Sequence, residues 1–186
     1  MIKKILLVIA ALIVLLVAAV VILAFAVSPD YKVEREITIN RPKSDVFNYV
    51  KMIKNQNTWG PWLKKDPTMK QEYRGNDGYV GFVSAWKSDN PEIGEGEQEI
   101  KNIVEGSRLD VELRFIKPFT STNQGFMTTE ATGSDSTRVK WGFSGAMPRP
   151  LNIMMLFVDM DKEVGNEFEE GLSSLKRILE TPPTVN

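Results

Sequence analysis

The sequence contains neither cysteine nor histidine among its 186 residues. Without cysteine there are no disulfides and no thiolate nucleophiles, and without histidine there are no Ser-His or Cys-His catalytic pairs. Zinc and copper sites that need nitrogen or sulfur ligands are excluded for the same reason. Asp159 and Asp161 resemble the beginning of a calcium loop, but its downstream ligands are missing, so we interpret the pair as a helix cap. We therefore expect neither a metal ion nor a cofactor.

Positive charge is not in excess either, because 23 Lys and Arg residues face 24 Asp and Glu residues, giving a net charge of −1. A near-neutral chain lacks the basic surface that binds a phosphate backbone, so we do not expect nucleic acid as a partner. The sequence also has no glycine-rich phosphate loop, nucleophile elbow or dinucleotide-binding fingerprint. These absences weaken the case for an enzyme and leave carboxylates, tyrosines and lysines for any acid–base chemistry.

The most prominent feature that is present is a run of 23 consecutive apolar residues, Ile5–Val27. As a helix it is about 34 Å long, enough to cross a hydrocarbon core of about 30 Å. We therefore predict a transmembrane helix that follows Lys3 and Lys4. The chain is divided accordingly into a basic tail over 1–4, a transmembrane helix over 5–27, a tether over 28–30, one domain over 31–181 and a tail over 182–186.

A cleaved signal peptide is the alternative interpretation of this segment, because basic residues precede it and Ala24-Phe25-Ala26 has the form of a cleavage site. The apolar stretch before that site, Ile5–Leu23, is longer than the roughly 7–15 residues usual for a signal peptide, which favours an uncleaved anchor. Long domains cross the membrane largely regardless of their charge, so the short basic tail decides the orientation. We expect a single-pass membrane protein with a cytoplasmic amino terminus and a periplasmic or extracytoplasmic domain. Cleavage would instead make it a secreted protein.

The hydrophobic periodicity of the domain changes along the chain. Tyr31–Ile39 alternates with a period of two and predicts a half-buried strand, and Arg108–Ile116 alternates more clearly still. Asp161–Leu179 has apolar residues at helical spacing and predicts a long amphipathic helix. Between these elements the pattern predicts a helix over 42–53, turns over 54–67, strands over 69–74, 79–86, 95–104, 121–132 and 137–145, and a tight hairpin turn over 75–78.

Several motifs together indicate a known architecture. They are Tyr31–Ile39, Arg41–Phe47, Trp59-Gly60-Pro61-Trp62, Gly94-Glu95-Gly96 and Phe168–Leu172. With these motifs the chain resembles the START/Bet v1-like (SRPBCC) superfamily, and in particular the membrane-anchored bacterial members of its polyketide cyclase/dehydrase and lipid-transport branch. The resemblance implies an α+β helix-grip fold preceded by one transmembrane helix. In this fold a curved antiparallel sheet of about seven strands wraps around the long carboxy-terminal helix, with a hydrophobic pocket between them.

The residue pattern is compatible with such a pocket, because a curved sheet and a single helix rarely touch along their whole lengths. Large aromatic side chains from several strands, together with adaptable methionines, suit a pocket that accepts loosely specified apolar ligands. For each of these side chains, packing in an ordinary core is the alternative. The candidate ligand-binding residues are Trp59, Trp62, Phe82, Trp86, Leu113, Phe115, Trp141, Phe143, Met155, Phe157 and Phe168.

Three functional hypotheses follow. The first, which we favour, is a membrane-anchored protein that binds or transfers a lipid or another hydrophobic small molecule, so that its partners are that molecule and the membrane. The second is a cyclase-like or dehydrase-like enzyme that uses a cavity carboxylate or tyrosine. Glu130 is then the candidate carboxylate, because it shares strand parity with Phe126; an edge or surface position is the alternative for this residue, and we favour it. The third is a non-catalytic module that recognises another envelope protein.

Overall fold

The computed structural model describes residues 1–181, so the tail predicted over 182–186 lies outside the described residues. The chain divides into two compact units. The first unit comprises Met1–Tyr31 and Ala146–Met160, and the second comprises Lys32–Gly145 and the described residues from Asp161 onward. Because residues 146–160 belong to the first unit, the predicted domain over 31–181 contributes to both units.

The first unit contains the long helix α1, Ile2–Ala26, and the short 3-10 helix η2, Leu151–Leu156. The large apolar side chains of α1 are exposed, and Ala24 is its only buried residue. Within residues 1–181, α1 is the one helix that is long and apolar enough to cross a membrane. The apolar helix predicted from the sequence is therefore present.

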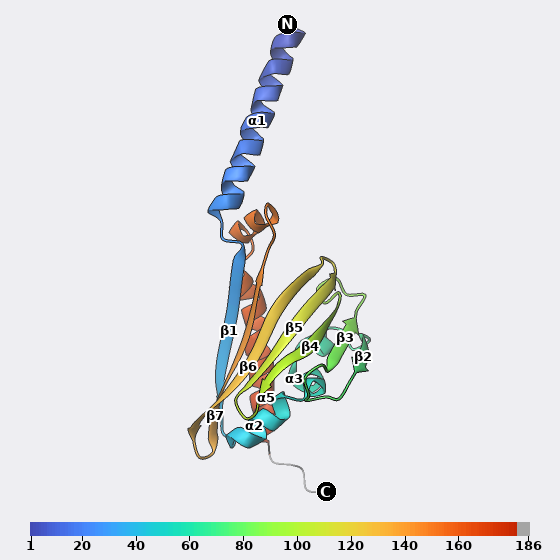
Figure 1. Ribbon diagram of the computed structural model, residues 1–186, viewed down its shortest axis with the longest axis vertical. Coiled ribbons are helices and arrows are strands. Elements are labelled where there is room, and N and C mark those ends of the chain that lie inside the picture. Colours follow the sequence, from blue (N-terminus) through green and yellow to red (C-terminus); the bar gives the residue numbers. More distant parts are fainter. Residues whose placement is uncertain (182–186) are drawn as a thin grey trace. The chain divides into compact units, whose positions relative to one another are not determined.

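The second unit is built around a seven-stranded antiparallel sheet (Figure 1). The strand order is β1-β7-β6-β5-β4-β3-β2, so strands β2 to β7 form a meander and β1 lies beside β7. Alternation explains how each strand faces the core: Leu109 and Val111 are buried, whereas Arg108 and Asp110, which alternate with them, are half-buried and form an ion pair. The strands are β1 Asp30–Ile39, β2 Lys70–Arg74, β3 Val83–Lys87, β4 Glu95–Val104, β5 Arg108–Lys117, β6 Ser121–Gly133 and β7 Ser136–Ala146.

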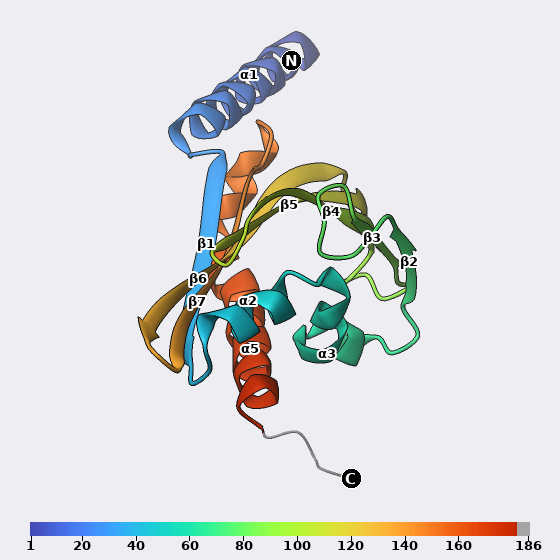
Figure 2. The same ribbon diagram turned by 60° about the horizontal axis from the view of Figure 1, so that its bottom comes forward.

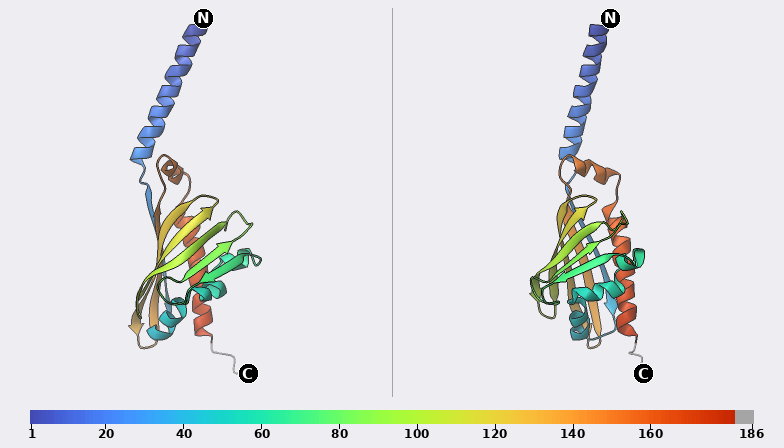
Figure 3. Two further views of the ribbon diagram at one scale, coloured as in Figure 1. Left: turned by 45° about the vertical axis from the view of Figure 1, so that its right-hand side comes forward. Right: turned by 90° about the vertical axis from the view of Figure 1, so that its right-hand side faces the viewer.

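The carboxy-terminal helix α5, Met160–Glu180, lies along the concave face of the curved sheet (Figure 2). Its predicted apolar stripe is confirmed, because Phe168, Leu172 and Leu175 are buried. The helices of the segment between β1 and β2, all in the second unit, lie on the same side of the sheet as α5 (Figure 3). The helix-grip architecture predicted for this chain is therefore observed.

The beginning of α5 is held to the first strand by one arginine. The Arg35 guanidinium donates hydrogen bonds to Asp161 at 2.9 Å and to Glu169 at 2.6 Å. Gly165 makes this approach possible, since a Cβ atom there would lie only 2.1 Å from an Arg35 nitrogen. These contacts lower the pKa of the Asp161 carboxyl, chiefly through its hydrogen bond with Arg35. The ion pairs therefore position α5 relative to β1.

The segment between the first two strands differs from the prediction. The helix expected over 42–53 ends at Val50, because the Asn55 side-chain amide donates to the Tyr49 carbonyl at 2.9 Å and satisfies the end of the helix. The stretch over 54–67, expected to consist of turns, forms short helices. The helices of this segment are α2 Lys43–Val50, η1 Ile53–Asn55, α3 Gln56–Trp59 and α4 Trp62–Lys65.

The predicted hairpin turn is longer than expected, so the strand expected over 79–86 begins only at Val83. The three glycines of this loop adopt positive φ angles, which other residues rarely do. Asp77 in the loop accepts hydrogen bonds from the backbone N–H groups of Ile53 at 2.8 Å and Lys54 at 3.1 Å. The loop therefore caps η1 rather than forming a two-residue turn.

Candidate ligand-binding cavity

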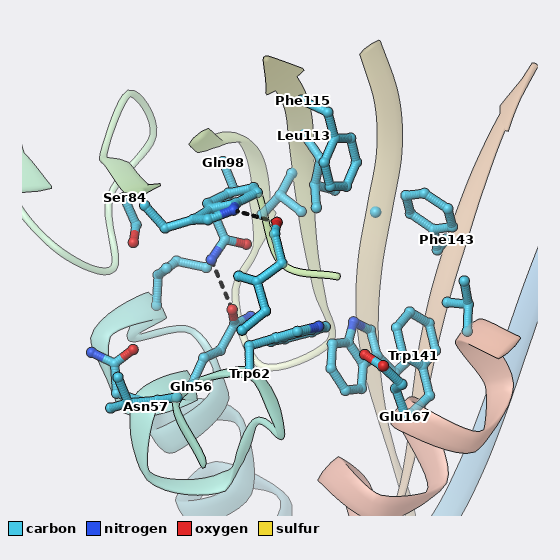
Figure 4. Close-up of a pocket in the computed structure, with 18 of the residues that line it drawn as sticks. Gln56, Asn57, Trp62, Ser84, Gln98, Leu113, Phe115, Trp141, Phe143 and Glu167 are labelled. Atoms are coloured by element: carbon cyan, nitrogen blue, oxygen red, sulfur yellow. Dashed lines mark hydrogen bonds between the residues drawn. The ribbon is translucent and has the colours of Figure 1, made fainter. Parts of the chain in front are cut away.

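A cavity of about 550 Å³ lies within the second unit, lined by the concave face of the sheet, α5, η1, α3 and α4 (Figure 4). Strands β2 to β7 all contribute side chains to its wall. Pockets for small organic molecules typically have volumes of about 300–1,000 Å³. The space between sheet and helix is therefore large enough for one such molecule.

One wall of the cavity is aromatic and aliphatic. Trp141 stacks on Phe168 of α5 with ring centroids 3.9 Å apart, and Trp62 meets the edge of Trp141 at 5.6 Å. Phe115 and Phe143 continue this wall along neighbouring regions of the sheet, with their centroids 6.4 Å apart. Such a surface favours the apolar body of a ligand, because burial removes apolar area from water.

The part of the cavity lined by α3, β3 and β4 carries uncharged polar side chains beside Trp86, as Figure 4 shows for Gln56, Asn57, Ser84 and Gln98. Gln98 of β4 donates to Gln56 of α3 at 2.7 Å. Asn57 and Gln71 exchange two amide hydrogen bonds, of 2.8 and 2.7 Å. A primary amide has two N–H donors and an oxygen acceptor, so the Gln56–Gln98 pair keeps further hydrogen-bonding capacity, whereas the Tyr73 hydroxyl accepts the second N–H of Asn57. The cavity can therefore hold an uncharged polar group against this wall.

Four ionisable residues also line the cavity: Lys65, Glu92, Glu163 and Glu167. Lys65 of α4 forms an ion pair with Glu167 of α5, and the hydrogen bond in this pair raises the pKa of Lys65. A lysine held in its protonated form is a poor general base. The Lys65–Glu167 pair therefore links α4 to α5 at the cavity. The amide and hydroxyl side chains of the polar wall carry no charge.

Comparison with known proteins identifies the fold. No protein-family model and no curated protein matches the chain. Among solved structures, truncated norcoclaurine synthase from Thalictrum flavum matches with a TM-score of 0.62 and 12% identity, over 84% of this chain and 97% of that one. The protein has the Bet v1-like fold. Its predicted resemblance to the START/Bet v1-like superfamily is confirmed at the level of the fold, and the branch within the superfamily stays a prediction.

Two further structures show the range of proteins that share this Bet v1-like fold. Norcoclaurine synthase from the same plant, in complex with dopamine and hydroxybenzaldehyde, has a TM-score of 0.59 and 12% identity over 85% of this chain and 91% of that one. The Aha1 dimer from Colwellia psychrerythraea has a TM-score of 0.55 and 13% identity over 81% of this chain and 96% of that one. The fold alone therefore does not assign an activity.

The Bet v1-like fold brings many, though not all, of the candidate ligand-binding residues to the cavity. Trp59 and Phe82 are at most 1% exposed, but they do not line the cavity. Phe82 packs instead with Ile53 and Ile100 in an adjacent core cluster. Met155 and Phe157 belong to the first unit and do not line the cavity. The candidates that line it are Trp62, Trp86, Leu113, Phe115, Trp141, Phe143 and Phe168.

The amide side chains of Gln56, Asn57, Gln71 and Gln98, which we call the amide wall, were not predicted from the sequence. A signal was present in β4, where Glu95, Glu97 and Glu99 alternate on one face and Gln98 therefore faces the opposite side with the buried Ile100. The partner amides of α3 gave no such signal, because this short helix was expected to be a turn. An uncharged glutamine on the inward face of a strand is the feature that indicates a polar subsite.

Glu130, the candidate catalytic carboxylate, does not face the cavity. Its side chain is 71% exposed and pairs with Arg138 at 3.4 Å. Either face of β6 could have been the buried one, because the adjacent apolar residues Phe126 and Met127 point to opposite faces of the strand. In the structure Met127 is the buried one. Glu130 therefore points away from the inward face, which confirms the favoured interpretation of it as a surface residue.

Glu95, Glu97 and Glu99 form part of an ion-pair network on β4. Arg114 of β5 contacts both Glu97 and Glu99 at 2.8 Å. Hydrogen bonds lower the pKa of all three carboxyls; the largest contribution comes from Lys117 for Glu95, Arg74 for Glu97 and Arg114 for Glu99. These carboxylates therefore link β4 to β2 and β5.

This network predicts an acid-sensitive fold. A carboxyl whose pKa is lower in the folded state contributes stability above its unfolded-state value of 4.5, and loses that contribution as the pH falls through the folded-state value. We expect the free energy of unfolding to decrease as the pH falls from about 5 to about 3. Urea titrations across this range measure the slope, and Arg114→Met should make it shallower. An equal slope in both proteins would contradict the assignment.

Proposed function

We propose that this protein is a membrane-anchored binding protein for a lipid or another hydrophobic small molecule. The observation that carries the proposal is the cavity of about 550 Å³ with an aromatic wall and an amide wall. An apolar surface of this kind, interrupted by a few convergent polar groups, is typical of ligand sites. The ligand class is therefore an apolar molecule that bears an uncharged hydrogen-bonding group.

The charges around the cavity disfavour an anionic ligand. Lys65 is the one cation among the lining residues, and Glu167 already neutralises it. A ligand carboxylate or phosphate would thus lose its hydration without gaining a free counterion, which is costly in an enclosed site. Hydroxyl, carbonyl and amide groups pay a smaller desolvation cost and can bond to Gln56 and Gln98.

The helix α1 supports the anchoring part of the proposal. Its length and composition suit a membrane span. The buried Asn152 side chain also donates to the carbonyls of Ala24 and Val27, both at 2.8 Å, so cleavage after Ala26 would remove part of a built contact. We infer an uncleaved anchor with a cytoplasmic amino terminus. An anchor of this kind raises the concentration of the cavity near the bilayer, where apolar ligands partition.

Native mass spectrometry of the full chain, purified in detergent, tests the binding function. We expect a bound small molecule that ejects at collision energies at which the protein stays folded, and extraction should yield an apolar compound without a formal charge. A population that is empty and takes up no added apolar compound would overturn the proposal and favour an interaction module. Conversion of the bound compound into a product during incubation would favour the enzyme.

The amide wall predicts a preference for ligands that carry a hydrogen-bonding group. Replacing Gln56 and Gln98 together by leucine removes both partners, so that neither amide is left unpaired. With fluorescent probes, we expect wild type to prefer 1-pyrenemethanol over 1-methylpyrene by about five- to tenfold, because a net hydrogen bond contributes about 1 kcal/mol. The double variant should lose this preference while its affinity for 1-methylpyrene stays unchanged. Gln124→Leu, at an exposed glutamine of β6, is the matched control. The same probe ratio in all three proteins would show that the amides do not contact the ligand.

A further inference from the structure

The connection between β7 and α5 carries an unusual apolar surface. No charged residue occurs between Arg149 and Asp159. Phe157 is 86% exposed, and the large apolar side chains around it are also exposed. This set, which we call the 151–158 segment, consists of Leu151, Met154, Leu156, Phe157 and Val158. Concentrated apolar exposure of this kind marks a surface that contacts a partner or a membrane.

The 151–158 segment is attached to the carboxy-terminal end of α1, within the first unit. Asn152 is fully buried and its amide donates to the carbonyls of Ala24 and Val27. The Arg149 side chain donates to the same Ala24 carbonyl at 2.8 Å and lies over the Phe25 ring at 5.1 Å. The last carbonyls of a helix have no partners within it, so these donors satisfy groups that the helix leaves open. The attachment is therefore polar, directional and specific to the end of α1.

The position of this attachment determines what surrounds the segment. A helix of 25 residues is about 37 Å long, slightly more than the hydrocarbon thickness of about 30 Å. If α1 spans the membrane, its last turn lies at the boundary between acyl chains and headgroups. Side chains fastened to that turn lie at the same depth, where leucine, methionine and phenylalanine gain by insertion. An arginine beside them suits the headgroup layer.

We propose that the 151–158 segment is a second membrane contact, inserted into the interfacial layer of the leaflet in which α1 ends. The inference rests on the membrane-spanning part of the proposed function and is independent of the ligand. Its occupant is the lipid surface, because the segment is continuous with the end of the apolar helix. The second unit is joined to the first at three points of the chain, near residues 31, 145 and 160. A bipartite anchor would therefore restrain the second unit more than a single flexible tether.

Site-directed labelling in lipid nanodiscs tests this proposal on the full chain. Because the sequence has no cysteine, a single introduced cysteine carries an NBD fluorophore alone. We use Phe157→Cys for the segment, Leu12→Cys for the span, and Asp135→Cys as the water-exposed control in the β6–β7 turn. We expect the label at 157 to emit at shorter wavelength than the label at 135. It should also be quenched several-fold less by iodide, and strongly by nitroxide-labelled lipid.

The label at position 12 separates the two ways in which the inference can fail. A label at 12 quenched by lipid nitroxide, with a label at 157 as accessible to iodide as that at 135, would overturn the interfacial segment and leave the span intact. A label at 12 open to iodide would overturn both. Protection of position 157 from iodide without quenching by lipid would indicate burial against protein, such as a second copy of the chain, and would also overturn the proposal.

Discussion

Replacing Trp141 by alanine is expected to lower the free energy of unfolding by about 3–5 kcal/mol, the range measured for removing a large aromatic side chain from a core. Trp141 is 7% exposed and lies at the centre of an aromatic cluster. It stacks on Phe168 and meets the edges of Trp59 at 4.9 Å and Trp62 at 5.6 Å. These contacts join β7 to α3, α4 and α5, so a single truncation weakens the packing of the helices on the sheet.

Urea unfolding of the full chain in detergent, followed by far-ultraviolet circular dichroism, measures this loss without depending on tryptophan emission. Phe119→Ala is the matched control, because Phe119 is 77% exposed and its truncation should change stability by less than about 0.5 kcal/mol. Trp141→Phe should recover part of the loss, since a smaller ring keeps some of the stacking. A loss below about 1 kcal/mol for Trp141→Ala would show that the cluster does not hold the helices in place.

Filling the cavity is expected to weaken ligand binding. Leu113 lines the cavity from the central strand β5, where it packs over Gly125; a Cβ on that glycine would lie 2.8 Å from the Leu113 side chain. An indole at position 113 cannot enter this contact and must extend into the cavity. We expect Leu113→Trp to weaken the binding of 1-pyrenemethanol at least tenfold, which corresponds to about 1.4 kcal/mol.

Energy transfer from the protein's tryptophans to the pyrene probe provides the measurement. All four tryptophans of the chain lie in the second unit, so probe dissolved in detergent or lipid contributes little. Ile116→Trp on the same strand is the control for the added tryptophan, because Ile116 is 49% exposed and does not line the cavity. Leu113→Met conserves volume and should bind normally. Wild-type affinity in a folded Leu113→Trp protein would mean that the probe binds elsewhere.

The parts of the structure that could be predicted from sequence are those with a local pattern. The apolar run of α1, the alternation of β5 and the helical stripe of α5 each follow from side chains within one element. The extended loop before β3 was mispredicted because its conformation depends on Asp77 binding the backbone of Ile53, a contact between distant segments. Local pattern did not decide the orientation of Glu130, since adjacent Phe126 and Met127 allowed either face of β6 to be the buried one.

The cavity shows the same division. Trp59 and Trp62 are separated by only two residues, yet Trp59 is buried without lining the cavity and Trp62 forms part of its wall. The amide wall depends on Gln98 meeting Gln56, which is 42 positions away in the chain. A local sequence pattern cannot predict this contact, because the contact forms only when the short helices pack against the sheet.

The sequence by itself therefore determined a membrane-length helix, an antiparallel meander and an amphipathic carboxy-terminal helix, because periodicity encodes which face of each element is apolar. Only the tertiary structure decided which aromatic side chains surround space rather than fill it, which neutral amides line that space, and that the 151–158 segment is fastened to the end of α1. The physical reason is that packing and long-range hydrogen bonds select among faces that are equally apolar or equally polar in the sequence.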